Sequence, residues 1–101
     1  MSFGLSLDAV KLVNGVFQLY PEVKHVKVFG SRAMDTYRPN SDIDLVIMDA
    51  KTSAKLARIL GDLEELALPY QFDLKCFEEI DNPDLIEHIE QYGKLFFKRD
   101  E

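Results

Sequence analysis

Hydrophobic side chains change their spacing along this chain, and each spacing predicts one kind of element. Residues 7–20 repeat apolar positions every three or four residues, which predicts a helix with Ser6 as its N-cap. Residues 56–66 show the same period and predict a second helix, capped by Thr52 or Ser53. We therefore expect two amphipathic helices, each with one apolar face.

A third helix is predicted near the end of the chain. Asn82 is a suitable cap, and Pro83 follows it at the first helical position. Apolar residues continue at helical spacing until Gly93, where the helix is expected to close. Residues 94–98 then read as a short extended tail.

Three segments alternate or run apolar over strand lengths: residues 23–29, 42–48 and 70–77. A short helix is expected just after Gly30, between the first two strands. The order is helix, strand, short helix, strand, helix, strand, helix. This order predicts one domain over residues 1–101, of the α/β (α+β) class, with a small mixed sheet flanked by helices.

Charge narrows the kinds of partner. The net charge is −6, which disfavours extended, non-specific contact with nucleic acid but leaves room for a nucleotide bound through metal ions. Residues 22–40 are locally basic and residues 78–101 strongly acidic. The single cysteine, Cys76, excludes an internal disulfide and is compatible with a reducing cytoplasm. No apolar run reaches the length of a membrane span, so no membrane partner is expected.

Two carboxylates open the second predicted strand. Asp42 and Asp44 stand at positions i and i+2, so they share one face, about 6–7 Å apart along the strand. Two like charges in one space repel each other, and a divalent cation between them removes the conflict. Because they precede the apolar run, they do not match phosphatase or glycosyltransferase sites, in which the acids follow the strand. Asp73, in the third strand, is a third carboxylate able to converge with them.

The step Gly30-Ser31 just upstream suits a phosphate. Glycine permits close approach of the backbone, and a serine hydroxyl beside free N–H groups at a helix start suits an anion. Two basic side chains each have two alternative roles. Arg32 contacts a bound phosphate or pairs with a surface acid, and Lys75 reaches a phosphate or a neighbouring carboxylate.

These residues together resemble the polymerase-β-type nucleotidyltransferase superfamily. The pattern is Gly-Ser-Arg-Ala at 30–33, Ser-Asp-Ile-Asp-Leu at 41–45 and Phe-Asp-Leu at 72–74. More narrowly, the chain resembles the small stand-alone minimal nucleotidyltransferases (MNT type), the partners of HEPN-domain proteins. The resemblance covers nearly the whole chain and implies a fold like the palm domain of polymerase β.

The resemblance also implies roles for individual residues. Asp42, Asp44 and Asp73 would hold two Mg²⁺ ions, and Asp73 would help to deprotonate the attacking hydroxyl. Gly30 and Ser31 would lie against the β- and γ-phosphates of ATP. Two ions about 3.5–4 Å apart would stabilise the entering and leaving oxygens of an in-line displacement.

The acceptor stays open at the level of sequence. The resemblance favours a HEPN-type helical partner and transfer of AMP from ATP to its tyrosine, with this chain as the antitoxin. Transfer to a small-molecule hydroxyl with a separate substrate-binding subunit is the second hypothesis, and non-catalytic neutralisation of a partner is the third. A second copy of this chain is the alternative to a separate helical partner for completing the substrate-binding site.

The remaining expectations concern the loop at residues 34–35 and two histidines. Met34-Asp35 stands where relatives often carry glycine, and aspartate tolerates left-handed backbone better than most residues. His25 and His88 show no identifiable partner, so a purely structural role is expected for both.

Overall fold

The computed structural model describes residues 3–49 and 53–99 of the chain. Its helices are α1 (Leu7–Gln18), α2 (Leu56–Glu64) and α3 (Pro83–Tyr92), and its strands are β1 (His25–Phe29), β2 (Ile43–Ile47), β3 (Phe72–Cys76) and β4 (Lys94–Lys98). Short 3₁₀ turns follow β1 (η1, Gly30–Arg32), precede α2 (η2, Ser53–Lys55) and follow β3 (η3, Phe77–Glu79). The predicted class and the short helix after Gly30 are confirmed.

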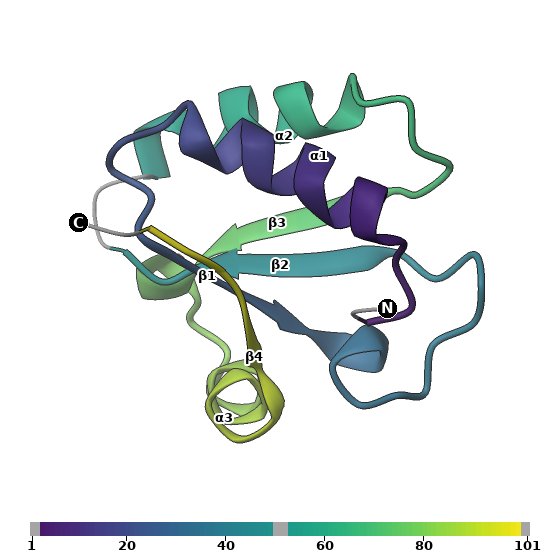
Figure 1. Ribbon diagram of the computed structural model, residues 1–101. Helices are drawn as coiled ribbons and strands as arrows, with labels where there is room; N and C mark the ends of the chain where they lie inside the picture. Colours follow the sequence, from purple (N-terminus) through teal and green to yellow (C-terminus); the bar gives the residue numbers. More distant parts are fainter. Residues whose placement is uncertain (1–2, 50–52, 100–101) are drawn as a thin grey trace.

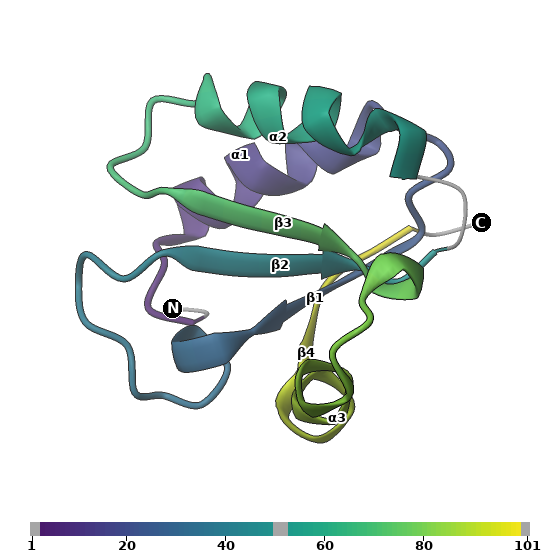
Figure 2. The same cartoon turned by 180° about the vertical axis from the view of Figure 1, so that it is seen from behind.

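The four strands form one mixed sheet in the order β3-β2-β1-β4. Strand β1 pairs antiparallel with β2 and β4, while β2 and β3 run parallel. Helices α1 and α2 lie side by side on one face, and α3 lies on the other (Figures 1 and 2). This arrangement is the expected small mixed sheet flanked by helices.

The two faces bury cores of different size. Under α1 and α2, buried side chains of both helices and all four strands form one large cluster, to which Ile43, Leu45 and Ile47 belong. Under α3, a small cluster of Phe29, Val46 and Ile89 is buried. The alternation predicted for residues 42–48 is therefore confirmed.

Strand β4 corrects the prediction of a mere extended tail for residues 94–98. The segment pairs with β1 and forms an edge of the sheet. Its register shifts between Val26 and Lys27, where Phe96 is the extra residue. Because this bulge breaks the alternation, both Phe96 and Phe97 reach the large core, where their rings pack against Phe3 and Phe17.

Two of the three predicted caps are present. Ser6 Oγ accepts a hydrogen bond from Ala9 N at 3.1 Å, and Asn82 Oδ1 accepts one from Asp84 N at 2.9 Å. For α2, Thr52 lies outside the described residues, whereas Ser53 begins η2 and Lys55 directly precedes the helix. No helix in the described part of the chain is long and apolar enough to span a membrane.

Candidate active site

The two strands that carry acids bring them into register. Asp44 on β2 is the direct partner of Asp73 on β3 in the parallel ladder. Neighbouring strands lie about 4.7–4.9 Å apart, so both side chains start from adjacent points on the face that α3 covers only in part. Asp42 lies just before β2 and is exposed.

Asp44 is the carboxylate most affected by this arrangement. Partial burial, followed by the charges of Asp73 and Asp42, raises its pKa from 3.8 to about 6, although Lys75 and Arg32 act in the opposite direction. The site therefore disfavours a third negative charge unless a cation balances it. The available donors are carboxylate oxygens, which are the ligands that Mg²⁺ prefers.

The three acids do not stand in a closed ligand set. Among the described residues, no group of three or more histidine, cysteine or acidic side chains is placed to hold a metal ion as it stands. Asp73 instead lies with Oδ1 3.7 Å from Lys75 Nζ, and its side chain is 46% exposed. Lys75 thus takes the carboxylate contact, one of its two predicted readings, and relieves part of the repulsion between Asp73 and Asp44.

The turn after β1 brings backbone against the carboxylates. Gly30 has φ +72°, and a Cβ at this position would collide with Asp44 Oδ2. Only glycine fits, because a side chain would collide with the carboxylate and also strain the left-handed backbone. The predicted proximity of the Gly30-Ser31 step to the acids is therefore present in the structure.

The rest of this turn is held by its own backbone. The Ser31 carbonyl accepts hydrogen bonds from the amides of Met34 at 3.2 Å and Thr36 at 3.0 Å. Asp35 adopts φ 59°, the left-handed conformation that aspartate tolerates. The Ser31 hydroxyl has no hydrogen-bond partner within the described residues and remains available to a ligand.

Arg32 does not occupy the phosphate-contacting position that the sequence suggested. It is 1% exposed, and it donates from Nη1 to the Phe3 carbonyl at 2.9 Å and from Nη2 to the Ser41 carbonyl at 2.8 Å. Its guanidinium carbon lies 5.2 Å from the ring centroid of Tyr37 and 5.0 Å from that of Tyr70. Arg32 therefore fixes the backbone directly before Asp42, and it acts on the site by positioning.

His88 is a site residue that sequence reasoning missed. Its Nε2 accepts a hydrogen bond from the Gly30 amide at 2.9 Å, and its ring packs edge-on against Phe29. The signal was present, because His88 lies three residues after Leu85 and four before Tyr92, at helical spacing on the side of α3 that faces the sheet. The Gly30 amide is thus already paired with His88.

The described structure resembles solved toxin–antitoxin structures. A toxin–antitoxin with AMP-PNP matches at 22% identity and a TM-score of 0.70, over 94% of this chain and 75% of that chain. The MntA-HepT toxin–antitoxin matches at 21% identity and a TM-score of 0.64, over 92% of this chain and 72% of that chain. The tri-AMPylated Shewanella oneidensis HEPN toxin in complex with MNT antitoxin matches at 20% identity and a TM-score of 0.61, over 90% of this chain and 73% of that chain. At these identities the likeness concerns the fold.

No curated protein matches the chain. In contrast, the family described as "Polymerase beta, Nucleotidyltransferase" matches residues 11–101. That range contains the Gly30-Ser31 turn and all three candidate carboxylates. The chain therefore belongs to the polymerase beta nucleotidyltransferase family.

Proposed function

We propose that this chain transfers AMP from ATP to a hydroxyl of a HEPN-type partner protein, in which a tyrosine is the acceptor. The observation that carries the proposal is the registered pair Asp44 and Asp73 beside Gly30, where no side chain other than hydrogen fits. A nucleotide whose phosphates lie at Gly30-Ser31 would have its α-phosphate near both carboxylates.

The chain's own residues divide the work. Ser31 would bind a phosphate through its hydroxyl, and Gly30 would let the backbone approach the triphosphate. Asp42, Asp44 and Asp73 would hold Mg²⁺, which supplies charge stabilisation for the entering and leaving oxygens when bound. Asp73, whose side chain is 46% exposed, would take the proton of the attacking hydroxyl.

The partner is proposed from the neighbours. Structures with this fold include an MNT antitoxin in complex with an AMPylated HEPN toxin. This match favours a protein acceptor over the small-molecule hydroxyl that the sequence left open. The single cysteine is compatible with a reducing cytoplasm, which is the compartment proposed here.

The test compares Asp44→Asn with Asp35→Asn, an acid-to-amide change in the exposed loop at a backbone conformation that asparagine also tolerates. Each variant is co-expressed with a candidate HEPN-type partner protein, and the intact mass of that protein is measured. We expect wild type and Asp35→Asn to add AMP units, and Asp44→Asn to lose about a thousandfold in rate or more. A fully active Asp44→Asn variant would falsify the proposal.

A further inference from the structure

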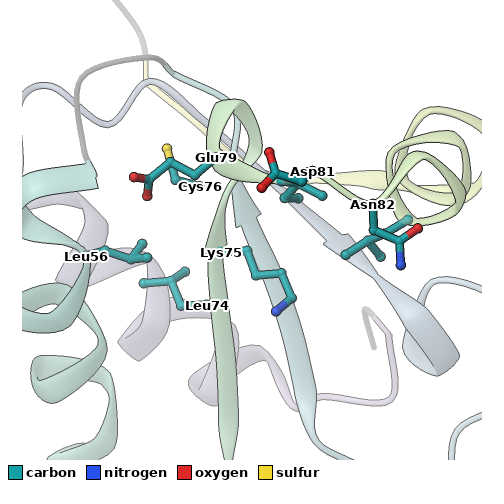
Figure 3. A pocket seen from close by; sticks show the side chains of 9 residues that line it. Leu56, Leu74, Lys75, Cys76, Glu79, Asp81 and Asn82 are labelled. Atoms are coloured by element: carbon teal, nitrogen blue, oxygen red, sulfur yellow. The ribbon is translucent and has the colours of Figure 1, made fainter.

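A groove of about 360 Å³ opens at the edge of β3, between the start of α2 and the start of α3 (Figure 3). Its apolar lining includes Leu74, Ile80 and Leu85, and its polar lining includes Lys75, Glu79 and Asp81. The groove is not part of the nucleotide-binding site proposed above. It lies next to the carboxylates along the same strand.

The order of the strands gives the reaction a direction. Gly30 directly follows β1, Asp44 is on β2 and Asp73 is on β3, so the three follow one another across the sheet. In an in-line displacement the entering and leaving oxygens stand on opposite sides of the phosphorus. If pyrophosphate leaves on the Gly30 side, the acceptor must approach from the β3 side, which is an edge of the sheet.

Lys75 connects this approach to the groove. Its side chain lines the groove, and its Nζ lies 3.7 Å from Asp73 Oδ1. Asp73 and Lys75 are two residues apart on one strand face, a step of about 6–7 Å. A backbone seated in the groove therefore needs a long side chain to bring its hydroxyl to Asp73, which favours tyrosine over serine or threonine.

The charges on the rim select the flanking residues of the acceptor. Glu79 and Asp81 are exposed, whereas the ammonium of Lys75 already faces Asp73. The rim is thus acidic towards solvent, which repels the phosphates of a nucleotide and attracts a basic peptide. The half-buried Ile80 and Leu85 offer apolar surface to the body of an aromatic ring.

We propose that this groove binds the segment of the acceptor protein that presents its tyrosine, and that this segment carries basic residues. The inference rests on the nucleotidyl transfer proposed above. The phenolic oxygen forms a bond to the α-phosphorus of ATP while the bond from that phosphorus to the α,β-bridging oxygen breaks. Pyrophosphate leaves, and the phenolic proton passes to the Asp73 carboxylate.

The experiment uses the full chain with MgATP and three short synthetic peptides. One peptide has a tyrosine between arginine and lysine residues, the second has glutamates in place of the basic residues, and the third has serine in place of tyrosine. The groove variant is the double charge reversal Glu79→Lys with Asp81→Lys. The matched control is Glu64→Lys with Glu65→Lys, two exposed acids at the far end of α2.

We expect AMP transfer to the basic tyrosine peptide, a KM for it at least tenfold higher in the groove variant, and no change in the control. The Kd of MgATP should stay the same in all three proteins. Equal KM values in groove variant and wild type overturn the inference, and so does a change in the Kd of MgATP alone, because the groove then serves the nucleotide. Equal transfer to the serine peptide contradicts the choice of tyrosine.

Amide chemical shifts of the ¹⁵N-labelled protein separate this inference from the proposed function. Without ATP, the basic tyrosine peptide should shift the amides of Lys75, Ile80 and Leu85, and the acidic peptide should not. Shifts at these residues without any AMP transfer would contradict the proposed nucleotidyl transfer, but they would support peptide binding in the groove. Shifts confined to other surfaces overturn the groove, whatever the enzymatic result.

Discussion

The two faces of the sheet differ although the same strands build both. On the face under α1 and α2, strand β2 buries Ile43, Leu45 and Ile47 completely. On the face under α3, the same strand buries Val46 but leaves Asp44 half-exposed. One face of the sheet therefore supplies the main core, whereas part of the other face stays uncovered and can carry charged side chains.

The gap exists because α3 covers only part of its face. The cluster beneath α3 consists of Phe29, Val46 and Ile89, and Asp44 and Asp73 stand near the starts of β2 and β3. The starts of these two strands lie away from α3 (Figure 2). A fully buried pair of carboxylates would cost several kcal/mol, so the site needs access to water or to a cation. The small second core therefore positions the site without closing it.

The largest expected effect comes from two neighbouring residues on opposite faces. Leu45→Ala should lower the free energy of unfolding by about 3 kcal/mol, because it leaves a cavity in the large core. Asp44→Asn should not lower it at neutral pH, because the amide removes repulsion from Asp73 and Asp42. Urea unfolding of the metal-free proteins measures both values.

This pair tests whether the faces are energetically distinct. A loss of stability in Asp44→Asn as large as that in Leu45→Ala would mean that the carboxylate supports the fold as the core does. The separation between a stabilising face and a reactive face would then be wrong.

Periodicity accounts for the parts of the fold that were predictable. Alternation along residues 42–48 placed Asp44 and Leu45 on opposite faces, and three- to four-residue spacing gave the helices. The spacing could not give β4, because two consecutive buried phenylalanines need a bulge, and a bulge depends on the register with β1. Periodicity also could not predict that Arg32 is buried, because its carbonyl and tyrosine partners come from separate segments of the chain.

An intermediate effect is expected at the contact that joins α3 to the Gly30 turn. His88→Phe keeps a ring against Phe29 but leaves the Gly30 amide without an acceptor, whereas the side-chain oxygen of His88→Gln can accept that hydrogen bond. Loss of such a bond costs about 1–1.5 kcal/mol. We expect His88→Phe to raise the KM for ATP by roughly tenfold at unchanged kcat, and His88→Gln to restore most of it.

Steady-state kinetics with MgATP tests this expectation, together with amide hydrogen exchange at Gly30. His88 positions the turn and touches no reacting atom, so a purely structural role would change melting temperature and leave the KM for ATP unaltered. Equal KM values for His88→Phe, His88→Gln and wild type would show that α3 merely covers its face and that its contact with the Gly30-Ser31 turn does not affect ATP binding.

The smallest expected effect is a pH dependence confined to the open face. Burial and the neighbouring acids raise the pKa of Asp44 from 3.8 to about 6 in the folded protein, so the folded state holds this proton more tightly than the unfolded chain. The resulting stability is present below pH 4 and is lost as the pH rises through 6. Because the carboxyl is half-exposed, screening reduces the effect to about 1 kcal/mol.

Thermal unfolding of metal-free wild type and Asp44→Asn should therefore agree near pH 4 and diverge in favour of the variant by pH 7. Magnesium should then stabilise wild type more than the variant, because the variant keeps only Asp42 and Asp73 of the three proposed ligands. A difference between the two proteins that stays constant across this range would place the charge conflict outside Asp44.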